Sequence, residues 1–262
     1  MAAVETALSQ ARAAGRPSLV TYVTGGIRDD WTDLLAAMIG AGADAVEIGL
    51  PFSDPMLDGP TIQQASSTAI GRGANTAAIL AELHDAGTGD VPLIALAYAN
   101  QACGRGIDAY CHELADAGFS GMIIPDLPVA EAGDYLDAAS EAGLDATLMV
   151  TPATPQEQIQ VIAGRTRGFL YVMSVMATTG SANERDDARR WAVAARAVRH
   201  SPLPVLIGFG IDTPGRAAAA ARHADGVIVA SALMRRVLDG ATSTDIARAV
   251  ADLRTAVDGA RR

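Results

Sequence analysis

Three acidic residues of the stretch VEIGLPFSDPMLDGP, residues 46–60, have the types and spacing for acid–base chemistry. Glu47 interrupts an apolar run, and Asp54 and Asp58 follow on a segment whose prolines and glycine set rigid turns. Two carboxyl groups in different environments can divide the roles of proton donor and charge stabiliser. From the residues alone Asp54 and Asp58 are equivalent. The helix predicted from Pro60 also leaves open that Asp58 caps that helix or is simply solvated.

The run around Glu47 alternates with period two, as the two faces of a strand do. Val46 and Ile48 share one face, and Ala45, Glu47 and Gly49 share the other. If the branched residues pack under helices, Glu47 points into the interior of the sheet near the C-terminal end of its strand. Burial there raises the pKa of a carboxyl group, which suits proton transfer near neutral pH. The alternative is a structural glutamate bonded by neighbouring hydroxyl or amide groups.

Eight β-rich runs alternate with Ala-rich helical stretches along the chain, a pattern typical of repeated βα units and a parallel sheet. The predicted strands are 18–24, 44–50, 91–98, 120–126, 144–150, 168–174, 203–209 and 225–231. Eight units in 262 residues predict an α/β fold, a single (β/α)8 TIM barrel domain over residues 1–262, with an extra N-terminal helix across its bottom. A doubly wound sheet stays open, although no early G-x-G-x-x-G follows a strand.

The last two predicted strands end in GFGI (208–211) and VASA (229–232), and a helix follows each. Gly-rich turns with backbone N–H groups at a helix N-terminus form the common phosphate site of barrel enzymes. Ser231 would add a hydroxyl to such a site. The alternative is that Ser231 and Asp212 only cap their helices. The long polar segment after the sixth strand, 174–190, is typical of a lid, and the alternative is a merely mobile loop.

Composition excludes several classes of function. All 20 basic residues are arginine, so a lysine Schiff base, including covalent pyridoxal phosphate, is excluded for this chain. The net charge of −10 disfavours nucleic acid and anionic membranes, and no apolar run is long enough to span a bilayer. The four histidines fall in or at the ends of predicted helices, so we predict no metal site. Two cysteines without motif spacing agree with a reduced compartment, and we expect a cytoplasmic protein with a small-molecule substrate.

Seven motifs together resemble the tryptophan synthase alpha chain family. They are GADAVEIGLPFSDPMLDGPTIQ (42–63), AYAN (97–100), GIDAY (106–110), PDLPVAEA (125–132), GFLYVMS (168–174), GFGI (208–211) and ADGVIVASAL (224–233). The likeness runs from the first strand to the last, and PFSDP-x-x-DGP is specific. It implies a TIM barrel lyase of tryptophan biosynthesis that cleaves indole-3-glycerol phosphate to indole and glyceraldehyde 3-phosphate. This retro-aldol reaction uses neither metal nor Schiff base.

The resemblance also implies roles for the matching residues. Glu47 is expected to move protons, and Asp58 to bond the indole N–H and stabilise its developing positive charge, so Asp58 is no longer equivalent to Asp54. The implied indole pocket comprises Tyr22, Leu96, Tyr98 and Tyr171, and Thr179 is also implied to bind the substrate. The implied phosphate site comprises Gly180, Gly210, Ile211, Ala230 and Ser231. For the apolar and aromatic members, plain barrel core is the alternative.

The family further implies a tryptophan synthase beta chain as partner, in an alpha2beta2 hetero-oligomer whose pyridoxal phosphate belongs to the beta chain. The alpha chain itself is expected to need no cofactor. Asp126 of PDLP would then support the site from behind or face a partner.

The sequence departs from the family pattern at several places. The lid reads SVMATTG, with Val175 and Ala177 in place of an arginine and a glycine, and the first loop, VTGGIRDDW (23–31), is shorter than usual. Gln101-Ala102-Cys103 stands where apolar residues are common, and Ala230 replaces a glycine. Two alternatives therefore stay open: a free-standing lyase that releases indole, and a non-catalytic activator of a beta subunit.

Overall fold

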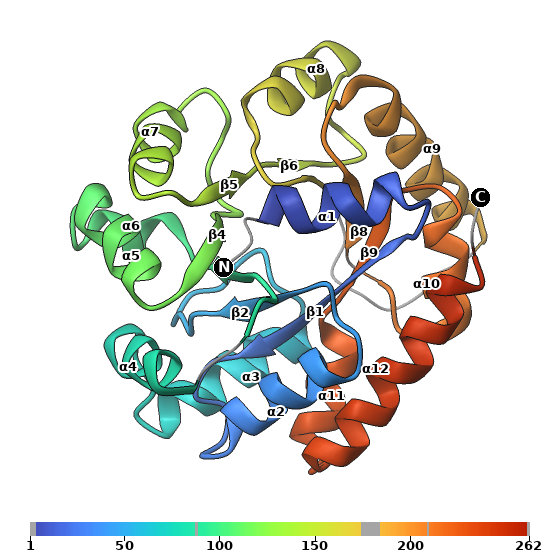
Figure 1. Cartoon of the computed structure of the whole chain (residues 1–262). Coiled ribbons are helices and arrows are strands. Elements are labelled where there is room, and N and C mark those ends of the chain that lie inside the picture. Colours follow the sequence, from blue (N-terminus) through green and yellow to red (C-terminus); the bar gives the residue numbers. More distant parts are fainter. Residues whose placement is uncertain (1–3, 87–88, 174–183, 209, 261–262) are drawn as a thin grey trace.

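A nearly closed parallel barrel forms the centre of the molecule (Figure 1). The computed structural model of the chain describes residues 4–86, 89–173, 184–208 and 210–260. Its sheet has the strand order β5-β4-β3-β2-β1-β9-β8-β7-β6. The strands are β1 (Ser18–Thr24), β2 (Ala45–Gly49), β3 (Leu93–Leu96), β4 (Phe119–Ile123), β5 (Asp145–Thr147), β6 (Met149–Val150), β7 (Leu170–Met173), β8 (Val205–Gly208) and β9 (Gly226–Val229). The predicted TIM barrel is confirmed.

The fifth predicted strand, 144–150, is interrupted at Leu148 and forms both β5 and β6. β5 pairs with β4, whereas β6 pairs with β7, so this one run supplies both edges of the sheet. The Leu148 N–H donates to the Thr166 hydroxyl at 2.8 Å, and the Leu148 carbonyl accepts from Tyr171 N at 3.1 Å. The hydroxyl of Thr166 thus satisfies a backbone group at the interruption, and eight predicted strands become nine.

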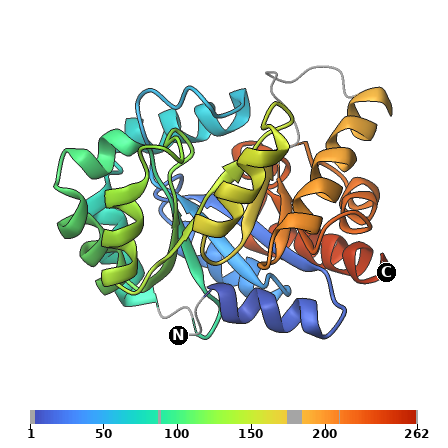
Figure 2. The same ribbon diagram turned by 90° about the horizontal axis from the view of Figure 1, so that it is seen from above.

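Helices surround the sheet, and one lies across its amino end. They are α1 (Val4–Ala13), α2 (Trp31–Gly40), α3 (Pro60–Gly71), α4 (Thr76–Ala86), α5 (Ala99–Cys103), α6 (Ile107–Asp116), α7 (Gly133–Glu141), α8 (Gln156–Arg165), α9 (Glu184–His200), α10 (Pro214–Ala221), α11 (Ser231–Leu238) and α12 (Ser243–Asp258). Figure 2 shows α1, in dark blue, on the opposite side of the strands from α3. Val4 and Leu8 of α1 pack into the barrel interior, which confirms the expected covering of its bottom. The short α5, which ends at Cys103, was not predicted.

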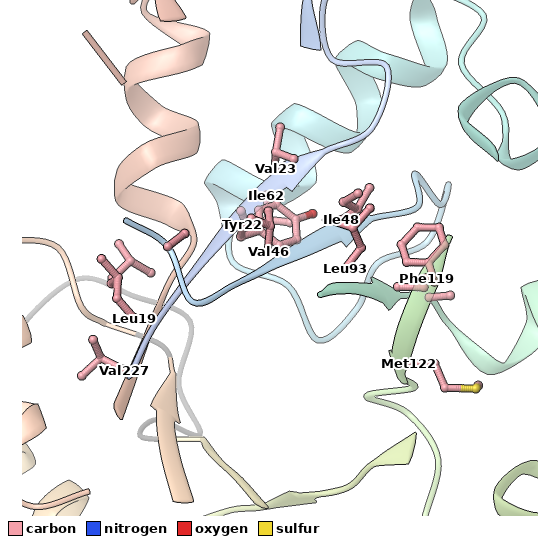
Figure 3. Packing of buried hydrophobic residues seen from close by; sticks show 14 of the residues in the cluster. Leu19, Tyr22, Val23, Val46, Ile48, Ile62, Leu93, Phe119, Met122 and Val227 are labelled. Carbon is pink, nitrogen blue, oxygen red and sulfur yellow. The ribbon is translucent and has the colours of Figure 1, made fainter. Parts of the chain in front are cut away.

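Alternation along the strands builds two apolar layers. Val46, Ile48 and Leu93 pack between the sheet and the helices, as Figure 3 shows. Ala45 and Ile94 belong instead to the cluster inside the barrel. Because Glu47 has the parity of Ala45, its side chain must face the interior.

Ion pairs fix the amino ends of the strands. Asp44, directly before β2, pairs with Arg16 at 2.5 Å and with Arg254 of α12 at 2.9 Å. Its carboxylate also accepts from the backbone N–H of Leu19 at 2.8 Å. Asp44 thereby joins the first two strands to the last helix.

Candidate active site

Glu47 lies in the barrel interior beside Tyr22 of β1, its register partner, and is 1% exposed. Its Oε1 atom has no hydrogen-bond partner among the residues that the structure describes. Burial, reinforced by the nearby charge of Asp58, raises the pKa of Glu47 to about 8. A structural glutamate would be bonded by neighbouring groups, and Oε1 has no such bond among the described residues. With a pKa of about 8, the side chain is mainly protonated at neutral pH.

Asp58 lies on the β2–α3 loop (residues 50–59) and turns toward Tyr98, which directly precedes α5. The Tyr98 hydroxyl donates to Asp58 Oδ2 at 3.2 Å and accepts from the backbone N–H of Leu57 at 3.2 Å. Burial raises the pKa of Asp58 to about 6, although the bond from Tyr98 opposes the shift. The N-cap of α3 is Gly59, without a side-chain cap bond, so the capping alternative for Asp58 is wrong.

Asp54, on the same loop, has a different environment. It is exposed and accepts a hydrogen bond from the hydroxyl of its neighbour Ser53 at 2.6 Å. Asp58 is drawn toward the barrel, whereas Asp54 faces solvent. The structure thus separates two residues that their type and loop position leave equivalent.

Two buried tyrosines occupy the interior next to Glu47, and glycines make room for them. Burial raises the pKa of both Tyr22 and Tyr171, and the charge of Glu47 adds to each shift. A Cβ atom on Gly49 would lie 1.8 Å from the Tyr22 hydroxyl oxygen, and one on Gly208 would lie 2.1 Å from that of Tyr171. Neither side chain could keep its position against a larger residue. Sequence reasoning missed Gly208, although it begins the GFGI motif.

Half-buried apolar side chains line the rim above Tyr171. Leu96, Met149 and Met173 all pack against the interior cluster. Met149 and Met173 also line a cleft of about 320 Å³ beside the barrel mouth, together with Pro125 and residues of α8. The rim is therefore apolar and contains flexible thioethers, a surface suited to a planar aromatic ring. Of the four residues expected at the indole, Tyr22 lies beside Glu47, Tyr98 bonds Asp58, and Leu96 and Tyr171 belong to the interior cluster. The two methionines were not foreseen.

Four of the predicted phosphate residues, Gly210, Ile211, Ala230 and Ser231, follow two adjacent strands, β8 and β9. Gly210 adopts a φ of 74°, and its carbonyl accepts from Arg216 at 3.4 Å. Ala230 is the N-cap of α11 and Ser231 is its first residue, so backbone N–H groups of that first turn are available to an anion. Ile211, which follows Gly210, is buried. Thr179 and Gly180 lie outside the described residues.

The alternative of simple capping at these strand ends is wrong on both helices. Thr213, not Asp212, caps α10, and its hydroxyl accepts from Arg216 N at 3.3 Å. Asp212 instead pairs with the Arg216 guanidinium at 3.2 Å. Ser231 makes no cap bond to α11, whose N-cap is Ala230.

No group of three or more His, Cys, Asp or Glu side chains within residues 4–86, 89–173, 184–208 and 210–260 is arranged to hold a metal ion. His84 and His112 lie in outer helices, His200 ends α9 and His223 follows α10, as predicted. Across the same residues, none of the helices has the length and apolarity needed to cross a membrane.

Comparison with known proteins decides the family. A sequence profile described as "Tryptophan synthase alpha chain" matches residues 8–259. The chain belongs to the tryptophan synthase alpha chain family. The alpha chain of Thermobifida fusca is 37% identical over 243 residues, which cover 91% of this chain and 90% of the relative. That of Phenylobacterium zucineum is 40% identical over 229 residues, covering 86% and 82%.

Solved structures of the tryptophan synthase alpha chain family have the same fold. A tryptophan synthase structure from Mycobacterium tuberculosis superposes with a TM-score of 0.88 at 31% identity and covers 98% of this chain and 99% of that one. The subunit alpha from Legionella pneumophila gives a TM-score of 0.88 at 28% identity, covering 99% of each. Membership confirms the lyase of tryptophan biosynthesis expected from the motifs.

Two departures from the tryptophan synthase alpha pattern fall on described residues of the site. Ala230 stands at the N-cap of α11, directly after β9. Gln101 lies in α5 and bonds the segment that follows Glu47. The altered lid positions Val175 and Ala177 lie outside the described residues.

Proposed function

We propose that the chain cleaves indole-3-glycerol phosphate with Glu47 and Asp58 as the two groups that touch the reacting indole. One observation carries the assignment: a buried Glu47 with an unpaired Oε1 shares the barrel mouth with Asp58, and their pKa values are about 8 and about 6. At pH 7 the first is mainly a proton donor and the second mainly a carboxylate. Two carboxyl groups with separated pKa values are suited to an acid and a charge stabiliser.

The reaction then needs only these two side chains and the ring of the substrate. Glu47 donates its proton to ring carbon C3, and the positive charge that develops on the indole nitrogen is stabilised by the Asp58 carboxylate, which accepts its N–H. The Glu47 carboxylate takes the proton of the side-chain hydroxyl next to the ring. The bond between that carbon and C3 breaks, its electron pair returns to the ring, and the products are indole and glyceraldehyde 3-phosphate. Glu47 ends protonated, as it began.

The remaining predicted residues would hold the two ends of the substrate. Tyr22 is the register partner of Glu47, Tyr98 bonds Asp58, and Leu96 and Tyr171 belong to the barrel interior, which supports their assignment to the indole. Gly210, Ile211, Ala230 and Ser231 would hold the phosphate through backbone N–H groups at the start of α11 and through the Ser231 hydroxyl. We assign Thr179 to the substrate and Gly180 to the phosphate from the family resemblance alone.

We further propose that the chain works with a beta chain in an alpha2beta2 assembly in the cytoplasm, and that any pyridoxal phosphate belongs to that partner. The β2–α3 loop supports an interface, because Met56 is 78% exposed and Leu57 is 39% exposed directly before Asp58. Exposed apolar side chains next to a site residue are typical of a partner surface. A beta chain bound to Met56 and Leu57 would affect Asp58 directly, because Asp58 follows Leu57 in the chain.

Indole release from indole-3-glycerol phosphate tests the proposal, with two asparagine variants of the same loop. Asp58→Asn should lower kcat by about 10²–10³-fold, because a neutral amide stabilises the developing charge less. The matched control Asp54→Asn should keep the wild-type rate. Equal losses in both variants would contradict the assignment of Asp58.

The same assay with and without a beta chain tests the partner. Strong activation supports the assembly. Full activity of the isolated chain would indicate a free-standing lyase instead. No indole release in either condition would indicate that the chain is a non-catalytic activator of a beta subunit.

A further inference from the structure

Gln101 makes contacts in two directions from the third position of α5. Its Oε1 atom accepts from the backbone N–H of Tyr98 at 2.9 Å. Its Nε2 group donates toward the carbonyl oxygens of Pro51 at 3.3 Å and Leu50 at 3.5 Å. One half-buried amide thus bridges the residue before α5 and the start of the β2–α3 loop.

Through these partners Gln101 is connected to both ends of the segment that carries Asp58. Leu50 directly follows β2, and its backbone N–H donates to the Leu96 carbonyl of β3 at 2.9 Å. At the far end the Tyr98 hydroxyl bonds both Leu57 N and Asp58 Oδ2. The backbone of Tyr98 is therefore held by Gln101, while its side chain holds Asp58.

Ring packing completes the connection. Phe52, near the start of the β2–α3 loop, stacks on Tyr98 with ring centroids 5.2 Å apart. Phe52 is itself fixed by Ser66 of α3, whose hydroxyl accepts from its N–H at 3.0 Å. The loop is thus tied to Tyr98 both near its start and at its end.

We propose that Gln101 is a positioning residue that fixes Tyr98 and the start of the β2–α3 loop, so that Asp58 faces the reacting indole. The inference rests on the proposed role of Asp58 and adds a residue outside the expected site. It also assigns a purpose to a polar residue at a position where the family commonly has apolar ones.

The contacts predict how loss of the amide would appear in kinetics. An apolar side chain at position 101 leaves the Tyr98 N–H and the two loop carbonyls without their amide partner, so Asp58 is held less well in the productive geometry. Tyr22 and Tyr171 lie on other strands, and the Tyr98 ring keeps its stacking on Phe52, so the residues assigned to the indole should bind substrate nearly as before. The loss should therefore fall on kcat more than on KM.

The pH profile supplies a readout that a purely structural role would not change. The bond from Tyr98 lowers the pKa of Asp58 against the effect of burial. Weakening that bond raises the pKa, so the acidic limb of the kcat profile moves to higher pH. The direction follows because the ionised form of Asp58 is the one that Tyr98 stabilises.

The experiment compares Gln101→Met, of similar length, with the matched control Gln160→Met on α8, where the exposed Gln160 side chain contacts His200, far from the loop. For Gln101→Met we expect a fall in kcat of about 10-fold, a KM within about twofold of wild type, and an acidic limb about 0.5–1 unit higher. Tyr98→Phe should shift the limb in the same direction. The double variant should shift it no further, because both changes act through one bond.

Gln101→Glu is a second variant in case methionine prevents folding, which far-UV circular dichroism and thermal unfolding would report. Glutamate keeps an acceptor for the backbone N–H of Tyr98, but it places a carboxylate oxygen against the carbonyl oxygens of Leu50 and Pro51. We therefore expect the same shift of the acidic limb to higher pH. Unchanged kcat and limb in a folded variant, or shifts that add to those of Tyr98→Phe, would overturn the inference. Glu47→Gln separates this from failure of the proposed function, because that variant should be inactive whatever Gln101 does.

Discussion

Two carboxyl groups near strand β2 lie in opposite environments: Asp44 directly precedes the amino end of the strand, and Glu47 lies on it, nearer the carboxyl end, facing the barrel interior. At the amino end Asp44 contacts Arg16, Arg254 and the Leu19 N–H. Three residues later Glu47 is buried with Oε1 unpaired among the described residues. A buried carboxyl group is expected to have partners unless it performs chemistry.

This difference shows where the barrel separates stability from function. At the amino end, charges join elements that are distant in sequence, since Asp44 connects β2 to α12. At the carboxyl end, the fold keeps a side chain that its own burial disfavours. Burial raises the pKa of Glu47 from the ordinary value of 4.5 to about 8, which shows how strongly the site disfavours the ionised form. Variants at both ends can test the separation.

The largest effect is expected for Glu47→Gln, with opposite signs on activity and stability. Loss of the proton donor should lower kcat by about 10³-fold or more. The folded protein keeps the Glu47 proton up to about pH 8, whereas the unfolded chain releases it near 4.5, so wild-type stability falls as pH rises through this window. The variant has no ionisable carboxyl group at this position, so its stability does not fall in this window. Its free energy of unfolding should exceed that of wild type by on the order of 3 kcal/mol at pH 8, and by much less at pH 5.

Urea unfolding at the two pH values measures this difference, and the indole assay measures the rate. Glu47→Gln with wild-type activity would remove Glu47 from the mechanism. A stability gain that is equal at pH 5 and pH 8 would show that ionisation of Glu47 is not its cause.

Asp44→Asn should give the reverse pattern. The substitution leaves Arg16 and Arg254 without their common carboxylate, and breaking these partly buried pairs is expected to cost about 2 kcal/mol, between the values for exposed and buried pairs. The free energy of unfolding should fall by that amount, while kcat at a temperature where the variant is folded stays at the wild-type value. A loss of kcat without a loss of stability would mean that the two ends of β2 are not separate in function.

Gly49→Ala should have an intermediate effect at the carboxyl end. Its Cβ would meet the Tyr22 hydroxyl at 1.8 Å, so the tyrosine must leave its present position beside Glu47. We expect kcat/KM to fall by about 10-fold, with a stability loss of about 1–3 kcal/mol from overpacking. Gly164→Ala on α8 is the matched control, since a Cβ there meets no atom within 4 Å. It should leave kcat/KM unchanged, and equal losses in both variants would point to a general effect of alanine on folding.

The strands and the inward direction of Glu47 were predictable because both follow from local periodicity. The interruption at Leu148 was not, because LDATLMV has the pattern of one continuous strand and the break depends on the Thr166 hydroxyl, 18 residues away. The short helix α5 was not predicted for a similar reason. Its five residues carry too little periodicity to be distinguished from a loop.

The candidate site divides along the same line. Glu47 and Asp58 belong to one motif, so the sequence indicated them together. The bond between Asp58 and Tyr98 spans 40 residues, and the contact of Gln101 with Leu50 spans 51, so no local pattern predicts either. Gly208 and Met173 face each other in register on β8 and β7, a relation that exists only once the sheet has formed.

The smallest expected effect is a twofold change in rate on either side of neutral pH. If catalysis needs Asp58 ionised and Glu47 protonated, kcat/KM should be highest near pH 7 and fall to about half near pH 6 and near pH 8. Because the two groups interact, these limbs belong to the pair. Asp44→Asn should keep both limbs, since its carboxyl group is at the other end of β2. A profile without an alkaline limb would show that Glu47 is not needed as a proton donor, and the contrast between the two ends of the strand would then be one of burial alone.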